Sequence, residues 1–187
     1  MRESAQRKIT NSIETAVSGS ALQSIGIIYG METNKKINCE IVEFNEGHRD
    51  QVIKVIDTVL KNLEVIPASD ELIDDEDLYK IPEVYKGRGR FWVALEQGRV
   101  IGTVAIREID SNVAKLNRMF VLMEYHGTGA GQTLLNKALD FARQQGYKEV
   151  ILNTHLLMKR AHHFYEKNGF VKIREDDEEY HYKLILD

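Results

Sequence analysis

The sequence predicts an α/β fold in which a mixed central β-sheet of about six or seven strands is flanked by helices. From residue 37 onward, short alternating apolar runs are separated by segments whose apolar residues recur at helical spacing. In the middle of the chain, an apolar run at 116–122 leads into a glycine-rich stretch at 125–135, YHGTGAGQTLL, and then into an amphipathic segment that ends near Gly146. Strands and helices that alternate in this way are typical of a sheet covered by helices.

Each expected element follows from its own local pattern, with period two for strands and period 3.6 for helices. In chain order we expect a strand at 37–44, a helix at 50–63, a variable segment with both prolines at 66–90, a hairpin at 91–95 and 100–109, a strand at 113–121, a helix that ends by 146, a strand at 149–154, a helix at 159–168, and closing strands at 171–174 and 180–186. Trp92 is expected in the core of its strand.

Composition and charge restrict the classes of function. The chain has 187 residues, a formal net charge of −4 and one cysteine, Cys39.

We assign residues 1–36 to an N-terminal extension and residues 37–187 to the main domain. For the extension, an extra helix, a partner-binding arm and a partly ordered tail stay open. The charge argues against a nucleic-acid partner. No apolar run approaches the ~18 residues of a membrane span, and no signal-peptide core is recognised, so we expect a cytoplasmic protein without a membrane partner.

The glycine-rich stretch has the features of an anion-binding loop. Gly127, Gly129 and Gly131 let the backbone turn tightly and approach a ligand without Cβ clashes. A helix that begins directly after them presents free N–H groups and the positive end of its dipole. Two familiar phosphate loops do not fit, because Gln132 and Thr133 stand where a P-loop has Lys and Ser or Thr, and the dinucleotide fingerprint lacks its glycine at position six.

Two segments together resemble the GNAT superfamily of N-acetyltransferases, which use acetyl-coenzyme A. The loop pattern of that family is Gln or Arg, two variable residues, Gly, one variable residue, then Gly or Ala. Residues 126–131, HGTGAG, match it with His126 in the first place. Residues 161–170, AHHFYEKNGF, match a second family pattern, A-x-x-x-Y-x-x-x-G-F. The resemblance covers about 37–187 and implies a GNAT-type α/β sandwich and a GNAT acetyltransferase domain.

The resemblance also implies a site for acetyl-coenzyme A. In the family, the strand before the loop splays away from the next strand, and its backbone bonds the pantetheine arm; here that backbone belongs to Met119, Phe120 and Val121. The pyrophosphate is expected on the loop, whose residues are His126, Gly127, Thr128, Gly129, Ala130 and Gly131. Many relatives carry Asn where this chain has Met158, so this contact with the cofactor arm is either lost or supplied by another group, for which Asn153 and Thr154 are the candidates. A glycine turn without a ligand is the plain alternative.

The resemblance implies that Tyr165 is the general acid, because in the family the tyrosine at this place takes that role. An acid near the sulfur assists expulsion of the coenzyme A thiolate, and a phenol with a pKa of ~10 is protonated at neutral pH. The plain alternative is core packing, because Ala161, Phe164 and Tyr165 share one face of an amphipathic helix. The general base stays open among Glu108, His155 and a chain of waters.

The expected reaction is direct transfer of the acetyl group to a primary amine of a small molecule or peptide, without a metal. The resemblance implies that segments 66–90 and 174–182 lie near the acceptor. Acidic runs at 74–77 and 176–179 suit a cationic amine, although solvated loops are the commoner explanation. Cys39 lies outside both patterns, so a thiol relay has no support. A coenzyme A-binding regulatory module is the alternative function, and a homodimer stays open.

Overall fold

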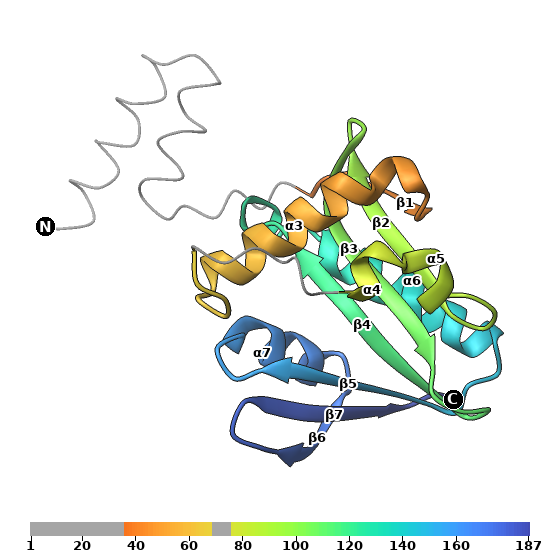
Figure 1. The fold of residues 1–187 in the computed structure, drawn as a ribbon. Coiled ribbons are helices and arrows are strands. Elements are labelled where there is room, and N and C mark those ends of the chain that lie inside the picture. The colour runs from red at the N-terminus through yellow and green to blue at the C-terminus, as the bar shows by residue number, and fades with distance from the viewer. Residues whose placement is uncertain (1–35, 69–75) are drawn as a thin grey trace, which may run out of the picture. The chain divides into compact units, whose positions relative to one another are not determined.

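A computed structural model describes residues 36–68 and 76–187, which form a seven-stranded sheet with helices on both faces (Figure 1). The strand order is β1-β2-β3-β4-β5-β7-β6, and only β4 and β5 pair in parallel. The predicted α/β sandwich with a mixed sheet is therefore confirmed. The predicted extension at 1–36 lies outside the described residues except for its last residue, Lys36.

The chain builds this sheet from short elements. In order they are β1 (Glu40–Glu43), η1 (Glu46–His48), α3 (Arg49–Asn62), α4 (Glu76–Tyr79), α5 (Ile81–Val84), β2 (Arg90–Glu96), β3 (Arg99–Glu108), β4 (Val113–Val121), η3 (Met123–Tyr125), α6 (Ala130–Gln144), β5 (Glu149–His155), α7 (Lys159–Lys167), β6 (Val171–Glu175) and β7 (Glu179–Ile185). Within the two described ranges, no helix is long and apolar enough to cross a membrane.

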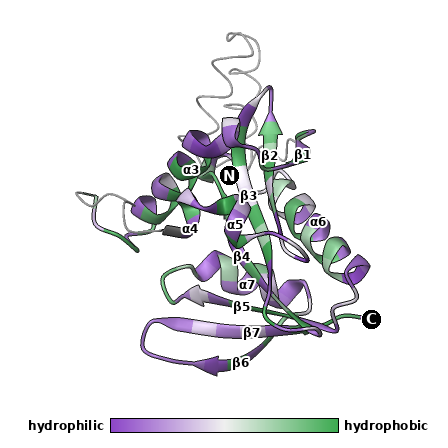
Figure 2. Cartoon of the chain, turned by 45° about the vertical axis from the view of Figure 1, so that its right-hand side comes forward, coloured by the Kyte–Doolittle hydropathy of each residue, from purple (hydrophilic) through white to green (hydrophobic). Residues whose placement is uncertain are grey.

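One hydrophobic cluster lies on each face of the sheet. On one face, Leu134 of α6 and Tyr165 of α7 pack in the same cluster as buried residues of the central strands. On the other face, Val52 and Ile56 of α3 share a second cluster with residues of α4 and α5. Figure 2 shows the hydrophobic residues concentrated along β2 and β3, whereas β6 and β7 are largely hydrophilic. The middle of the sheet is thus the core, and the β6–β7 end is more open to solvent.

The observed boundaries differ from the sequence prediction mainly in the first half of the domain. The first strand spans four residues instead of 37–44. The segment 66–90 contains two short helices, α4 and α5, which agrees with its sequence pattern, although that pattern did not predict their bounds. The hairpin and its turn are confirmed: Gln97 and Gly98 both have positive φ, 49° and 80°, as a type I′ turn requires. Trp92 is 1% exposed, which confirms it as a core residue.

Arg88 ties together three loops at the end of the sheet where β4 begins. Its guanidinium donates to Glu108 Oε1 at 2.8 Å and to the carbonyl oxygens of Gln145 at 2.8 Å and Ser111 at 3.1 Å. The same group lies 4.2 Å from the ring centroid of Tyr147. A planar fork of donors suits this set of partners, and a lysine ammonium does not reproduce it.

Arg88→Ala should lower the free energy of unfolding by about 2 kcal/mol, because carbonyl oxygens lose a charged donor. Arg88→Lys should restore less than half of that loss, since it keeps the charge but not the fork. Urea unfolding of the three proteins measures both effects. Equal stability of the lysine variant and the parent would show that charge alone matters at this position.

Candidate functional site

Strands β4 and β5 are paired only at one end. Their register joins Val113 to Glu149 and ends with Lys115 opposite Ile151, whereas β4 continues to Val121 and β5 to His155. Beyond the last pair the two strands diverge, which is visible in Figure 1. The splay expected from the family resemblance is present, and it leaves the second half of β4 without a strand partner on its β5 side.

A distortion in β4 accompanies this divergence. Arg118 has a left-handed backbone, with φ 53°, and the β3–β4 register shifts between Thr103 and Ala105. Thr103 Oγ1 donates to the Arg118 carbonyl oxygen at 2.6 Å, and the Arg118 guanidinium is paired with Asp77 on α4. A non-glycine residue stays in this conformation only when its surroundings hold it, and such residues gather at functional sites. Nothing in the sequence singled out Arg118.

The glycine-rich loop connects β4 to α6 in the predicted way. Gly127 and Gly129 have φ of 79° and 96°, and Gly129 is the N-cap of α6. The amides of Gly127, Gly129, Gly131 and Gln132 donate no hydrogen bond to any described residue. These donors include the free N–H groups that every helix start leaves over. The loop therefore presents a set of unpaired donors at the positive end of a 15-residue helix.

Space is left above these glycines. A Cβ added at Gly127 or Gly129 would meet no atom within 4 Å, and one at Gly131 would lie 3.8 Å from Val121 Cγ2 and 4.0 Å from Met119 Cε. The Gly131 position thus faces the side chains at the splayed end of β4. The loop and the strand end therefore lie side by side. The predicted cofactor contact of the Met119, Phe120 and Val121 backbone stays a prediction.

His126 fastens the loop to the strand. Its Nε2 lies 3.0 Å from the Val121 carbonyl oxygen, so this nitrogen carries the proton that it donates. Burial lowers the pKa of His126, and the nearby positive charge of Arg160 lowers it further. Thr128 is buried, and its Oγ1 donates to the Tyr125 carbonyl oxygen at 2.7 Å. His126 and Thr128 thus hold the shape of the loop through their side chains.

Tyr165 belongs to the hydrophobic cluster on the face covered by α6 and α7, and Met119 and Val121 at the end of β4 pack against the same cluster. Tyr165 is 5% exposed and packs among the rings of Phe164, Phe170 and Tyr182, with centroids 5.5 to 6.2 Å away. Burial raises the pKa of its phenol well above the ordinary value of 10. The hydroxyl therefore stays protonated throughout the physiological range, as a general acid requires. Its role in catalysis stays a prediction.

The structure separates the two side chains considered as general base. Glu108 pairs with Ala114, at the closed end of the β4–β5 contact, and is bound by Arg88. His155 ends β5 at the open end, where its Nδ1 accepts from the Leu157 amide at 3.2 Å. Of these two, only His155 lies where the strands have parted.

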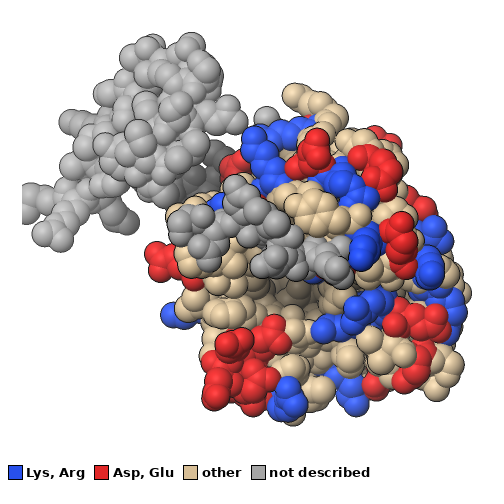
Figure 3. Space-filling model, viewed as in Figure 1, with Lys and Arg blue, Asp and Glu red and all other residues tan. Residues whose placement is uncertain are grey.

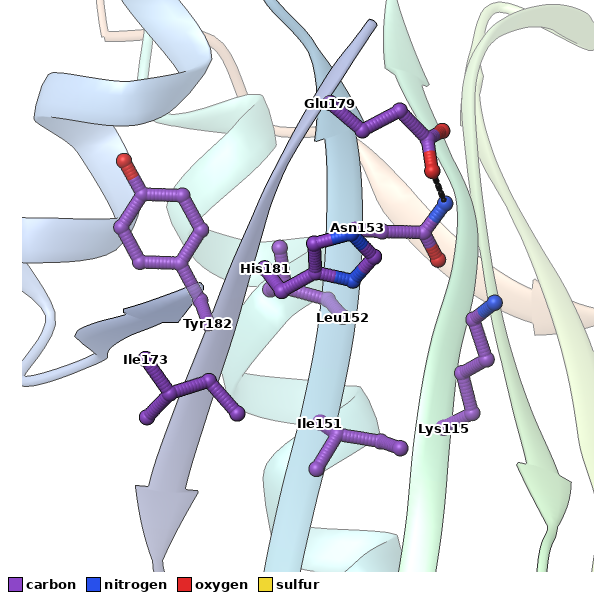
Figure 4. Close-up of a pocket in the computed structure, with 8 residues that line it drawn as sticks. All are labelled: Lys115, Ile151, Leu152, Asn153, Ile173, Glu179, His181 and Tyr182. Atoms are coloured by element: carbon purple, nitrogen blue, oxygen red, sulfur yellow. Dashed lines mark hydrogen bonds between the residues drawn. The ribbon is translucent and has the colours of Figure 1, made fainter. Parts of the chain in front are cut away.

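A hollow of about 250 Å³ begins at the last β4–β5 pair. It is lined by Lys115, Ile151, Leu152, Asn153, Ile173, Glu179, His181 and Tyr182 (Figure 4). Asn153 Nδ2 donates to Glu179 Oε2, so the predicted cofactor contact of Asn153 stays a prediction. The Tyr182 ring points to the other side of the sheet, where its hydroxyl contacts His162 and Glu166 of α7. The hollow thus opens on the face away from α7.

Comparison with known proteins identifies this arrangement. The model of the acetyltransferase (GNAT) family matches residues 58–170, which is more than half of the chain. The chain belongs to the GNAT family. It is similar to N-acetylaspartate synthetase from Xenopus tropicalis, with 41% identity over 81 residues, covering 43% of this chain and 30% of that protein. It is also similar to N-acetyltransferase 8 from Mus musculus, with 37% identity over 107 residues, covering 54% of this chain and 47% of that protein. The chain spans less than half the length of these curated relatives.

Solved GNAT structures match nearly the whole described domain. An acetyltransferase from Streptococcus agalactiae superposes with a TM-score of 0.72 at 29% identity, covering 79% of this chain and 98% of that one. The PaiA N-acetyltransferase from Thermoplasma acidophilum, solved in complex with coenzyme A, has a TM-score of 0.70 at 22% identity and covers 80% of this chain and 100% of that one. The latter likeness concerns the fold alone. These neighbours show that this chain has the GNAT fold.

Proposed function

We propose that this GNAT domain is an acetyl-coenzyme A-dependent N-acetyltransferase that transfers the acetyl group directly to a primary amine. The main support for this proposal is the loop at residues 126–131, whose unpaired amides lie at the start of α6 and beside the splayed end of β4. This combination suits a cofactor with a pyrophosphate and a peptide-like arm. The curated relatives carry names of N-acetylating enzymes, which supports the amine as acceptor.

The residues present fit acetyl-coenzyme A in two places. The amides of Gly127, Gly129 and Gly131 would hold the pyrophosphate, assisted by the dipole of α6. The unpaired edge of β4 at Met119, Phe120 and Val121 would bond the amide groups of the pantetheine arm, as an added strand does. Acetyl-coenzyme A supplies the acetyl group as a thioester when it is bound.

The two faces of the sheet would then serve different steps. The acceptor amine would approach from the face with the hollow, and Tyr165 would act from the face covered by α7. The two faces would meet where the pairing of β4 and β5 ends. As the amine attacks the thioester carbonyl and the carbon–sulfur bond breaks, Tyr165 would donate its proton to the leaving sulfur. His155 or a water would take the proton of the amine.

Direct transfer is proposed because no thiol is placed to carry the acetyl group. Cys39 is partly buried, and burial raises the pKa of its thiol, so the nucleophilic thiolate is scarce at neutral pH. We also propose the cytoplasm as the site of action, since a single cysteine suits a reducing compartment. A coenzyme A-binding regulatory module without transfer is the second candidate, and it differs from the first only in the absence of turnover.

A thermal-shift experiment with acetyl-coenzyme A, coenzyme A, ATP and NADH tests the cofactor site. A ligand at ~100 times its Kd stabilises a protein by about 2.7 kcal/mol, which is several degrees for a domain of this size. We expect this shift with the two coenzyme A species and none with ATP or NADH, which share the adenosine diphosphate but lack pantetheine. Equal shifts with all four would indicate a general nucleotide site. Thiol release with an amine panel then separates an enzyme from a regulatory module.

A further inference from the structure

Lys115, which lines the hollow, is opposite a second cation, Arg107, and neither has an ion-pair partner among the described residues. Arg107 of β3 and Lys115 of β4 are directly opposite in the antiparallel register, and both are half-buried. Like charges in this arrangement are destabilising. In the described part of the chain neither side chain makes a hydrogen bond or an ion pair, whereas the guanidinium groups of Arg49 and Arg88 each bind a carboxylate.

The environment of Lys115 disfavours its charge. Its pKa is lowered first by burial and then by the positive charge of Arg107, with a smaller effect of Arg118. The negative charge of Glu179 opposes this shift but does not cancel it. Glu179 also lines the hollow; it forms no ion pair with Lys115, and it already accepts a hydrogen bond from Asn153 (Figure 4). A half-buried cation in such a place is costly unless a bound anion neutralises it.

The other polar side chains of the hollow are engaged with neighbours. His181 lies 2.6 Å from Asp176 Oδ2 and 3.0 Å from Arg174 Nη2, on β7 and the β6–β7 hairpin. Figure 3 shows basic side chains on one flank of the hollow and acidic ones gathered over that hairpin. A ligand in the hollow would thus meet the free positive group of Lys115 and, beside Asn153, the carboxylate of Glu179 (Figure 4).

This polarity matches one class of acceptor. We propose that the amine acceptor also carries a carboxylate, as an α-amino acid does, and that Lys115 and Arg107 bind this carboxylate while Glu179 faces the amine. The inference rests on the proposed acetyltransferase function and names its substrate class. A volume of about 250 Å³ suits a molecule of amino-acid size, and the opposed Glu179 disfavours a multiply charged anion such as a phosphate ester. A polyamine, by contrast, would place a second cation against Lys115.

The test compares acceptors that differ only in the anionic group. Glycine, L-alanine, L-aspartate and L-glutamate are each assayed against their α-carboxamides, with spermidine as a cationic amine and coenzyme A release as readout. We expect kcat/KM for the preferred acid to exceed that for its carboxamide by about 10- to 100-fold, the range for a charge-assisted contact. Lys115→Gln should raise KM for the acid by a similar factor and leave the carboxamide unchanged. Arg107→Gln should also raise KM for the acid.

Lys183→Gln is the matched control. Lys183 lies on the same face of the sheet but is already paired with Glu149 at 3.4 Å. The substitution should therefore leave KM unchanged for both the acid and the carboxamide. Equal use of acids and carboxamides by the parent, a preference for spermidine, or an equal effect of Lys115→Gln on both acceptor types overturns the inference. So does failure with all four acids while the thermal shift with coenzyme A persists. Loss of that shift in the parent protein would instead refute the proposed function itself.

Stability gives a second readout that needs no acceptor. If Lys115 serves to bind the acceptor and not to stabilise the fold, Lys115→Met should raise the urea midpoint of the ligand-free protein. The substitution removes the repulsion by Arg107 and the free-energy cost of a half-buried charge. A lower midpoint would assign Lys115 a structural role and overturn the inference.

Discussion

Gly131→Glu should weaken binding of acetyl-coenzyme A by about 100-fold. The new side chain would start at a Cβ position 3.8 Å from Val121 Cγ2 and extend between the loop and the end of β4. A negative charge within several ångströms of a pyrophosphate, in a partly solvated site, costs about 3 kcal/mol, which corresponds to that factor. Isothermal titration calorimetry with coenzyme A measures the loss directly.

Two further substitutions at Gly131 separate bulk from charge. Gly131→Ala should bind coenzyme A like the parent, since its Cβ meets only ordinary contacts and the backbone there has no positive φ. The affinity of Gly131→Gln for coenzyme A should lie between those of the Ala and Glu variants, because glutamine adds the volume of the side chain without its charge. Equal binding by Gln and Glu variants would mean that no phosphate lies near this position.

The glycine loop was predictable because its function depends on backbone conformation, which glycine spacing reveals. Gly127 and Gly129 adopt the positive φ that only glycine takes readily, and the helix begins at Ala130 directly after them. The strand before it and the buried Tyr165 after it were likewise visible in the sequence patterns. Each of these features depends on residues that are close together in the sequence, so a local pattern is enough to predict it.

The partners of charged side chains were not predictable in the same way. Glu108 was a candidate base until the register placed it opposite Ala114, at the closed end of the β4–β5 contact. The acidic run at 176–179 was linked to a cationic acceptor, yet Asp176 accepts hydrogen bonds from His181, Arg174 and two backbone amides, which lower its pKa. Lys115 and Arg107 became neighbours only through strand pairing. Such contacts depend on long-range register, which a single sequence does not reveal.

Tyr165→Phe is the most direct test of the proposed chemistry, and kcat should fall by about 10-fold or more while affinity for acetyl-coenzyme A is nearly unchanged. The phenol is buried among three aromatic rings, so removal of one oxygen preserves the packing and removes only the proton donor. Single-turnover measurements with saturating acetyl-coenzyme A isolate the chemical step.

The pH dependence and a matched variant make this test specific. Because burial raises the pKa of Tyr165 above 10, the parent should show no alkaline loss of kcat from this acid below about pH 10. Tyr147→Phe is the control, because it also removes the hydroxyl of a buried tyrosine. That hydroxyl donates to the Arg88 carbonyl oxygen at 3.0 Å and lies at the closed end of the β4–β5 contact. The kcat of this variant should therefore equal that of the parent. If kcat of Tyr165→Phe equals that of the parent, the hydroxyl serves packing alone, and the leaving thiolate must take its proton from water through the gap between β4 and β5.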